Sequence, residues 1–462
     1  MKQQGTYQGW DFDNIWSIQT NKNKGYPFLK DNPSNSDVDA VDADKNALTW
    51  DSIKGGNSAP DNVTTNLSNP LPTTGVNGTT ISWSVDRVDW INTTTGEVTL
   101  PTSGQGHQIV TLTATISKGM FSGIKNFTLT IINTTMVVTP SASLVSGTYG
   151  GTQNITLYTV TEGATIYYTN DNSEPTTAST RYTTGIEVVS NMVIKAIAVK
   201  EGLENSPVST FEYVIFAGGD GSEANPYQVA TAEQLNNVRY NLGKHFQQTA
   251  DINLNSYNTD SGWEPIGSNS SSFNGTFDGN GNTISNLTIN RSTTDYIGLF
   301  SAIGATGKIQ NVKLENTNVT GRGHTGALVG DNYGAITNSY VMGTVTAGTG
   351  TSVGGLVGYN ESSISDSYTS GSVEGKAYTG GLVGYHSRGT ITLSYSTSTV
   401  KGESDVGGLV GGTFGGGTIT NSYARGAVTG TENGVGGLVG FNSHATITNA
   451  YATGVVKGID DV

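Results

Sequence analysis

Histidines and a Gly-x-Ser-x-Gly sequence are the first residues of this chain to test for catalysis. The five histidines never form His-Glu-x-x-His, the pattern that places two imidazoles on one helix face for a catalytic zinc ion, so we predict no metalloprotease site. Gly350-Thr351-Ser352-Val353-Gly354 matches the nucleophile elbow of serine hydrolases, but it lies in a repeated β segment, whereas the elbow needs a strand, a sharp turn and a helix. In a chain with 63 glycines among 462 residues, about one such match is expected by chance. We therefore predict no catalytic residues, no metal site and no cofactor.

Carboxylates are the remaining side chains that could be catalytic. β-Helical polysaccharide lyases and hydrolases place two or three acids about 5–10 Å apart on neighbouring coils. In the repeats of this chain the acids share no column, since Asp331 is replaced by aromatic residues in other copies and Glu374 by Thr or Lys. An acid cluster in the irregular region 250–330 therefore stays open as the alternative, a glycan-active enzyme. Its candidate residues are Asp251, Glu264, Asp278 and Asp295.

Aromatic residues at repeated places could bind a carbohydrate or a host-surface protein. Tyr359, Tyr385 and Phe441 share one place in three copies of a repeat, where Asp331 and Gly412 stand in two others. A broken column is less suited to bracing a structure, so ligand binding stays open beside bracing, and we predict these three aromatics as the ligand-binding residues. A second, unbroken column is favoured as a brace of stacked rings. It contains Tyr340, Tyr368, Tyr395, Tyr423 and Tyr451.

The repeat that carries these aromatics is written five times between 326 and 458. Each copy opens on a Gly-rich tetrapeptide such as Gly355-Leu356-Val357-Gly358 and continues to an Ile-x-x-(Ser/Ala)-Tyr sequence and a Val. The isoleucines step by 28, 27, 28 and 28 residues, and the tyrosines and valines step identically. Insertions therefore fall in turns, which is typical of a solenoid. The isoleucine column contains Ile336, Ile364, Ile391, Ile419 and Ile447.

Short alternating apolar runs interrupted by Gly predict strands, because no window keeps a helical period of 3.6 residues. A coil of ~28 residues made of two or three strands predicts a right-handed parallel β-helix, an all-β fold with coils about 4.8 Å apart. Asn332, Asn360 and Asn442 follow the tetrapeptide in three copies. We expect such asparagines to hydrogen-bond along the column and to satisfy the turns.

The copies resemble the bacterial GLUG motif, named for its Gly-Leu-hydrophobic-Gly core, and Phe273–Gly281 resembles the usual lead-in to such arrays. The resemblance implies a surface protein of the adhesin type, with a β-helix over 217–462. Residues 231–234 form a capping box, so we expect a helix over 231–243 that covers the first coil. Residues 1–30, with Trp-x-Phe and Tyr-Pro-x-Leu sequences, resemble the closing segment of an upstream array. The chain stops just after a full coil, so we expect it to be part of a longer polypeptide.

Two small β-sandwich domains are predicted before the β-helix. In 31–135, the Ile-Ser-Trp-Ser and Gly-Glu-Val-Thr sequences resemble a bacterial Ig-like domain. Its Asp-rich start, 31–46, fails the EF-hand pattern and is expected to be a solvated linker into a short helix near 45–53. In 136–216, the Tyr-Tyr-Thr-x-Asp and Ile-Lys-Ala-x-Ala sequences resemble the C-terminal sandwich of chitobiase and β-hexosaminidase. In that family the domain is an accessory, so the resemblance brings no active-site residue.

Composition narrows the function further. The net charge of −14 and the lack of a basic stripe speak against nucleic acid and anionic membrane surfaces, and no apolar run reaches the length of a membrane span. The absence of Cys removes disulfides and thiolate chemistry. We therefore predict a non-catalytic segment of an extracellular protein at the bacterial cell surface. Its sandwiches act as spacers, and its β-helix binds carbohydrate or protein ligands.

Overall fold

The computed structural model describes residues 11–12, 16–17, 27–29, 33–102, 105–133 and 135–459. They form two compact units. The first contains the described residues up to Val145 together with Ile155–Gly185 and Val193–Phe211, and the second contains Ser146–Asn154, Ile186–Met192 and the described residues from Glu212 onward. The predicted closing segment at 1–30 lies mostly outside the described residues. Within it the structure shows only the antiparallel pair β1 (Trp16–Ser17) and β2 (Phe28–Leu29).

The Asp-rich start of the first unit is a helix, α1 (Pro33–Ala47), so the predicted linker over 31–46 is wrong. The short 3-10 helix η3 (Trp50–Ser52) lies within the range predicted for a short helix, 45–53. One face of α1 buries Ala40 and Val41 along with Asp44. The Asp44 carboxylate accepts from the Asn77 amide groups and from the Thr79 hydroxyl, at 2.7 to 3.2 Å. Because the buried face is narrow and includes an acid, its apolar residues show no helical period in the sequence.

An antiparallel sheet packs with α1 in this unit. Its order is β3 (Thr80–Val85), β4 (Gln108–Lys118) and β5 (Phe121–Ile131), and inward residues alternate along β4 as a half-buried strand requires. Farther along the chain, β6 (Ser141–Ala142) pairs with β9 (Leu157–Tyr158), and β10 (Thr165–Thr169) pairs antiparallel with both β11 (Thr180–Arg181) and β13 (Met192–Val199).

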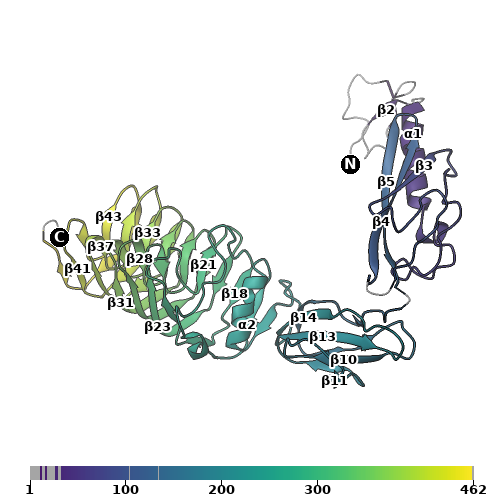
Figure 1. Cartoon of the computed structure of the whole chain (residues 1–462). Coiled ribbons are helices and arrows are strands. Elements are labelled where there is room, and N and C mark those ends of the chain that lie inside the picture. Colours follow the sequence, from purple (N-terminus) through teal and green to yellow (C-terminus); the bar gives the residue numbers. More distant parts are fainter. Residues whose placement is uncertain are drawn as a thin grey trace. The chain divides into compact units, whose positions relative to one another are not determined.

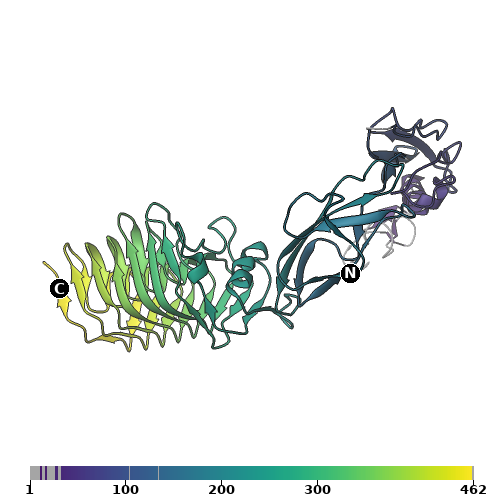
Figure 2. The ribbon, with the colours of Figure 1, turned by 60° about the horizontal axis from the view of Figure 1, so that its bottom comes forward.

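The second unit begins with short pairings and continues as a β-solenoid. β7 (Gly147–Gly150) runs parallel to the end of β14 (Ser209–Phe216), and β8 (Gln153–Ile155) pairs with β12 (Ile186–Val188). From Phe246 to Lys457 the chain winds through about eight turns, each adding one strand to several parallel sheets (Figures 1 and 2). The β-solenoid predicted from the repeats is confirmed.

Four parallel sheets form the sides of the solenoid. The first contains β15 (Tyr227–Val229), β16 (Phe246–Gln248), β18 (Thr276–Asp278), β22 (Lys308–Gln310), β26 (Ala335–Thr337), β30 (Ser363–Ser365), β34 (Thr390–Thr392), β39 (Thr418–Thr420) and β44 (Thr446–Thr448). The second contains β17 (Ile252–Asn253), β19 (Thr283–Ser285), β20 (Thr288–Asn290), β23 (Lys313–Gly321), β27 (Tyr340–Ala347), β31 (Tyr368–Glu374), β35 (Tyr395–Ser396), β36 (Thr399–Gly402), β40 (Tyr423–Ala424), β41 (Val428–Gly430), β45 (Tyr451–Ala452) and β46 (Val456–Lys457).

The third and fourth sheets are built only by the later turns. The third contains β21 (Phe300–Ile303), β25 (Val329–Asn332), β29 (Val357–Asn360), β33 (Val383–His386), β38 (Val410–Thr413) and β43 (Val439–Asn442). The fourth contains β24 (Thr325–Gly326), β28 (Thr351–Gly354), β32 (Ala377–Gly380), β37 (Ser404–Gly407) and β42 (Val435–Gly436).

Identical residues pair in register along the solenoid. Ile336, Ile364 and Ile391 are directly paired neighbours in the first sheet, and all three are fully buried. Asparagines after the glycine tetrapeptide also bond along their column, as expected, since the Asn332 side-chain amide donates to the Asn360 oxygen at 2.7 Å. Toward the first coils the column continues as Phe277 and Phe246, which thicken the core at that end.

A short helix lies at the first coil. α2 (Ala232–Asn237) continues into the 3-10 helix η4 (Val238–Tyr240), and Leu235 and Val238 are buried in the same core as the first coils. The Thr231 hydroxyl accepts from the Gln234 backbone N–H at 3.2 Å, and the Gln234 side chain accepts from the Ala230 N–H at 2.8 Å. Among the described residues no helix is both long and apolar enough to cross a membrane.

Candidate functional site

The tyrosine column, defined as Tyr340, Tyr368, Tyr395, Tyr423 and Tyr451, is a continuous stack on the second sheet. Successive ring centroids are 4.8, 4.8, 4.7 and 5.3 Å apart, and the planes differ by at most 16°. Each inner ring therefore has both faces covered by its neighbours and presents only its edge to solvent. At the Tyr340 end, the hydroxyl donates to Glu315 at 2.7 Å, and burial together with this bond raises the tyrosine pKa.

The three predicted ligand-binding aromatics lie on the third sheet, in one register column. Tyr359 and Tyr385 are stacked at 5.5 Å with 14° between their planes. The next place in the column is Gly412, but Phe414, two residues later, fills the gap by stacking on Tyr385 at 5.5 Å and 8°. Phe414 then contacts Phe441 at 5.1 Å. The break seen in the sequence is therefore closed by a ring from a neighbouring position.

The break at Asp331 is closed in a different way. The His324 ring stacks on Tyr359 at 5.5 Å and 22°, and its Nδ1 lies 2.5 Å from the Asp331 carboxylate. Asp331 itself is buried, so the histidine occupies the aromatic place while the acid fixes its orientation. Tyr296 and Tyr333 contact this part of the stack from its edge. We call the whole set the aromatic strip: Tyr296, His324, Tyr333, Tyr359, Tyr378, Tyr385, Phe414 and Phe441.

A left-handed backbone position on the fourth sheet supplies several of these rings. In each coil one residue of this sheet or next to it, at the same register position, has φ between 47° and 77°. Residues other than Gly rarely adopt this region. Register pairs these positions from one coil to the next. In chain order they are Tyr296, His324, Ser352, Tyr378, Asp405 and Gly434. The sequence gives no signal for this column, because neighbouring coils carry different residue types there.

Tyr378 is oriented unlike the other rings of the strip. Its plane makes 87° with Tyr385 and 85° with Phe414, at centroid distances of 5.2 and 6.3 Å. Its ring lies over Gly412, where an added Cβ would be 2.5 Å from the Tyr378 Cδ1. Because the stacked rings face along the solenoid axis, the perpendicular ring faces across it. Its neighbours in the left-handed column, Ser352 and Asp405, carry no ring that could cover that face.

Ser352, from the Gly-x-Ser-x-Gly sequence, occupies the left-handed column between His324 and Tyr378. Its φ of 66° is shared by residues of other types in the same column, so the backbone conformation belongs to the fold rather than to a nucleophile. The side chain is also buried, with 4% of its surface exposed. The surrounding segment is β28 of the solenoid, without the following helix that a nucleophile elbow requires.

Three of the four acids proposed for a glycan-active enzyme are bound by neighbouring groups. Asp251 accepts from the Thr283 N–H at 2.8 Å. Asp278 accepts from the Asn280 N–H and from side chains of the next coil, at 2.8 to 3.0 Å. Asp295 forms an ion pair with Arg322, whose hydrogen bonds lower the pKa of that carboxyl. A glycosidase acid instead needs a raised pKa.

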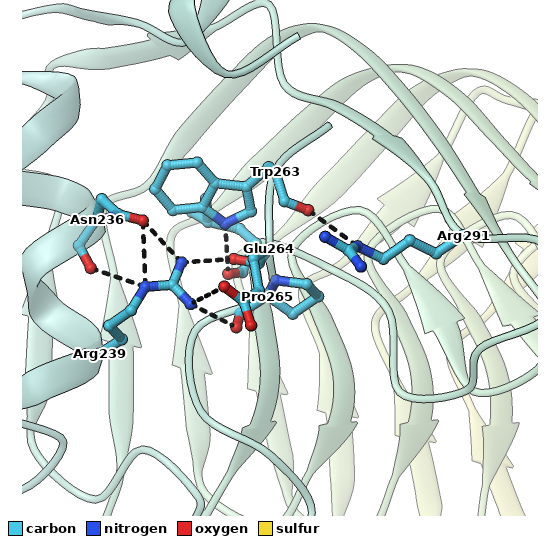
Figure 3. A network of polar contacts seen from close by, with 7 residues as sticks. Asn236, Arg239, Trp263, Glu264, Pro265 and Arg291 are labelled. Carbon is cyan, nitrogen blue, oxygen red and sulfur yellow. Dashed lines mark hydrogen bonds and ion pairs between the residues drawn. The ribbon is translucent and has the colours of Figure 1, made fainter. Parts of the chain in front are cut away.

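The fourth acid, Glu264, belongs to the network that joins α2 to the first coils (Figure 3). Arg239 binds the Asn236 side chain, donates to the Glu264 carbonyl at 2.8 Å and lies 3.2 Å from the Glu264 carboxylate. The Trp263 ring lies next to this guanidinium, 5.7 Å from centroid to Cζ. The network therefore fastens the helix to the solenoid. In the described parts of the chain, no group of three His or acidic side chains is arranged to hold a metal ion.

Comparison with protein families confirms the three resemblances found in the sequence. Residues 349–374, 402–429 and 431–457 match the GLUG motif. Residues 41–134 match the atrophied bacterial Ig domain, and residues 144–210 match the chitobiase/beta-hexosaminidase C-terminal domain. The chain therefore combines all three kinds of module.

Two similar proteins are much longer than this chain. A "Putative Gly-rich membrane protein" of Evansella cellulosilytica is 46% identical over 131 residues, which is 27% of this chain and 15% of that protein. Halomucin of Haloquadratum walsbyi is 35% identical over 185 residues, which is 38% of this chain and 2% of that protein. Among solved structures, an IgA1 protease aligns with 64% of this chain and 27% of its own, at 15% identity and a TM-score of 0.27.

Proposed function

We propose that this chain is a non-catalytic segment of a cell-surface protein, and that the aromatic strip of its solenoid binds carbohydrate. The observation that supports this most directly is the continuity of the strip. Rings from three different positions of the repeat close both breaks in the column, so one line of aromatic groups runs along several coils. Aromatic side chains supply large apolar contacts that suit the C–H faces of sugar rings.

An extracellular location fits the relatives and the composition. One relative is described as a membrane protein and the other as a halomucin, and a chain without cysteine needs no defined redox environment. The Ig-like and chitobiase-type modules serve as spacers between the solenoid and the rest of a longer polypeptide.

The absence of catalysis is part of the proposal. Asp251, Asp278 and Asp295 already accept hydrogen bonds that hold the coils together, and Glu264 belongs to the network at α2. A retaining or inverting glycosidase needs two carboxyl groups that converge on one bond, one of them protonated. We therefore expect these four acids to act structurally.

The test is a glycan array read together with a reducing-sugar assay on every glycan that binds. We expect binding without release of reducing ends. The variant Tyr359→Leu/Tyr385→Leu should lose binding, because leucine keeps apolar volume and removes the rings. The matched control is Tyr368→Leu/Tyr395→Leu in the tyrosine column, which should still bind.

Two results would contradict the proposal. Release of reducing ends that stops in Asp251→Asn or Asp278→Asn would make the chain a glycan-active enzyme. Loss of binding in the control variant alone, with the far-UV circular dichroism unchanged, would move the site to the tyrosine column.

A further inference from the structure

Asp405 is a partly buried carboxylate for which the fold provides no partner. It lies at the left-handed position of β37, with φ of 52°. Within residues 135–459, all of which the structure describes, no hydrogen bond or ion pair reaches its side-chain oxygens. Burial alone acts on this group and raises its pKa. Buried charges are normally paired or hydrogen-bonded, and a partly exposed carboxylate without a protein partner is open to solvent or to a ligand.

The neighbouring lysine does not pair with Asp405. Lys376, one coil earlier, lies 3.5 Å from the Glu403 carboxylate and is engaged there. On the next coil the register partner is Gly434, where an added Cβ would lie 2.5 Å from the Asp405 Oδ1. Glycine therefore leaves space for the carboxylate at this point and brings no donor.

The register partner on the preceding coil is Tyr378, the perpendicular ring of the aromatic strip. Burial raises the pKa of the Tyr378 hydroxyl, and the Asp405 charge raises it further. A ring face that is not covered by a stacked neighbour and an unpaired carboxylate thus lie on adjacent coils. Both groups attract a cation, the first through its quadrupole and the second through its charge.

We propose that Tyr378 and Asp405 form a binding site for the ammonium group of an amine-bearing glycan. This rests on the proposed carbohydrate binding of the aromatic strip and names the sugar chemistry that it selects. The ammonium donates to the Asp405 carboxylate and lies against the Tyr378 face, while uncharged parts of the sugar chain contact Tyr385 and Phe414. The net charge of −14 on the chain favours approach of a cationic polymer.

Two other occupants fit less well. Ca²⁺ and Mg²⁺ require several oxygen ligands, and Asp405 is a single carboxylate without a second acid bonded nearby. A basic peptide usually gains affinity by adding a strand to an open sheet edge. Strands β32 and β33 are hydrogen-bonded on both sides, so their lateral surface offers side chains only, which suits a rigid sugar chain better than an extended peptide.

The test compares glucosamine oligomers with N-acetylglucosamine oligomers of equal length, by titration calorimetry at a pH that keeps the amino groups protonated. We expect the glucosamine oligomer to bind more tightly, with an affinity that falls as salt is added. Asp405→Asn should weaken its binding about tenfold and leave the N-acetylated oligomer unaffected. Asparagine tolerates the left-handed backbone, so this variant should fold. Tyr378→Leu should weaken both oligomers.

Glu432→Gln is the matched control, because it removes an exposed acid on the next coil and should change nothing. Equal affinity of the two oligomers, or an Asp405→Asn variant that binds like the parent, would overturn the inference while leaving carbohydrate binding intact. Failure of both oligomers to bind would overturn it together with the proposed function. Tighter binding of an oligolysine peptide that depends on Asp405 would replace the glycan with a protein partner.

Discussion

Two aromatic surfaces of the same solenoid differ in how their rings are oriented. In the tyrosine column all five residues come from one position of the repeat, and neighbouring planes stay within 16° of each other. In the aromatic strip the rings come from three positions, and Tyr378 stands at nearly a right angle to its neighbours. The first surface is as regular as the repeat, and the second departs from it at Asp331, at Gly412 and at the perpendicular ring of Tyr378.

This difference separates bracing from recognition. A regular stack covers its own ring faces, so the contact energy is used between coils and only ring edges face the solvent. In the strip Tyr359 and Tyr385 are also covered on both faces, and Tyr378 is the ring that stands across the stack, with Asp405 on the next coil. Under the proposed function, aromatic rings from several positions of the repeat form a binding surface, and rings from one position form a structural stack.

The largest expected effect concerns His386, which directly follows Tyr385 of the aromatic strip. No histidine follows a tyrosine of the tyrosine column. Its ring is fully buried, and burial lowers its pKa from 6.5 to about 4. The unfolded chain therefore takes up a proton that the folded chain refuses as pH falls from about 6.5 to about 4. We expect the solenoid to lose roughly 3 kcal/mol of stability over that range and no more from this group below it.

Urea unfolding measured from pH 8 to pH 3.5 tests this expectation. His386→Asn is the control, since asparagine occupies the same column at Asn332, Asn360 and Asn442 and does not titrate. The parent should lose stability relative to the variant as pH falls from about 6.5 to about 4. A constant difference would show that His386 does not titrate below its ordinary pKa.

The second expected effect is on the tyrosine column. Tyr395→Ala removes a ring that stacks on both neighbours and should lower the free energy of unfolding by about 2 kcal/mol, less than for a fully buried aromatic because the ring is half-buried. Glycan affinity should not change. Tyr395→Phe keeps the stack and should be close to neutral in the same denaturation experiment. A variant that stays stable but loses glycan binding would reverse the roles of the two surfaces.

The smallest expected effect is on the geometry of the strip. A Cβ at Gly412 would lie 2.5 Å from the Tyr378 ring, so Gly412→Ala should push that ring away at a cost of about 1 kcal/mol. Amine-dependent binding should weaken more than stability does. Gly348→Ala, at a glycine with open space around it, is the control for both measurements. Equal effects of the two substitutions would show that Tyr378 adjusts without changing its orientation.

The repeat could be predicted from the sequence because its columns keep their spacing. Ile336, Ile364 and Ile391 recur at nearly constant steps. A shift of one residue in the register of a strand would turn its buried side chains to the solvent, so the spacing is kept. The bonded asparagines followed from the same argument. Such predictions depend on residues that repeat at one position, and they succeed where the fold itself is periodic.

The aromatic strip could be predicted only in part. Tyr359 and Tyr385 were visible as a column, but His324 and Phe414 reach into that column from other positions, and alignment of repeats does not show how far a ring extends. The orientation of Tyr378 depends on a left-handed backbone angle, and no residue type in the sequence indicates that angle. Helix α1 was missed for a related reason, since its buried face includes Asp44, which looks solvated in the sequence.

The left-handed column has a consequence for how such proteins diversify. In every coil the winding of the chain imposes this backbone angle, and it does so for Tyr, His, Ser, Asp and Gly alike. Every residue but glycine therefore has an energy penalty of about 1 kcal/mol at this position, which the rest of the fold offsets. Exchange of repeats between genes could thus alter the side chain at this position while the backbone stays the same. Under the proposed function, proteins built in this way would share an architecture and differ in the sugars they prefer, one turn at a time.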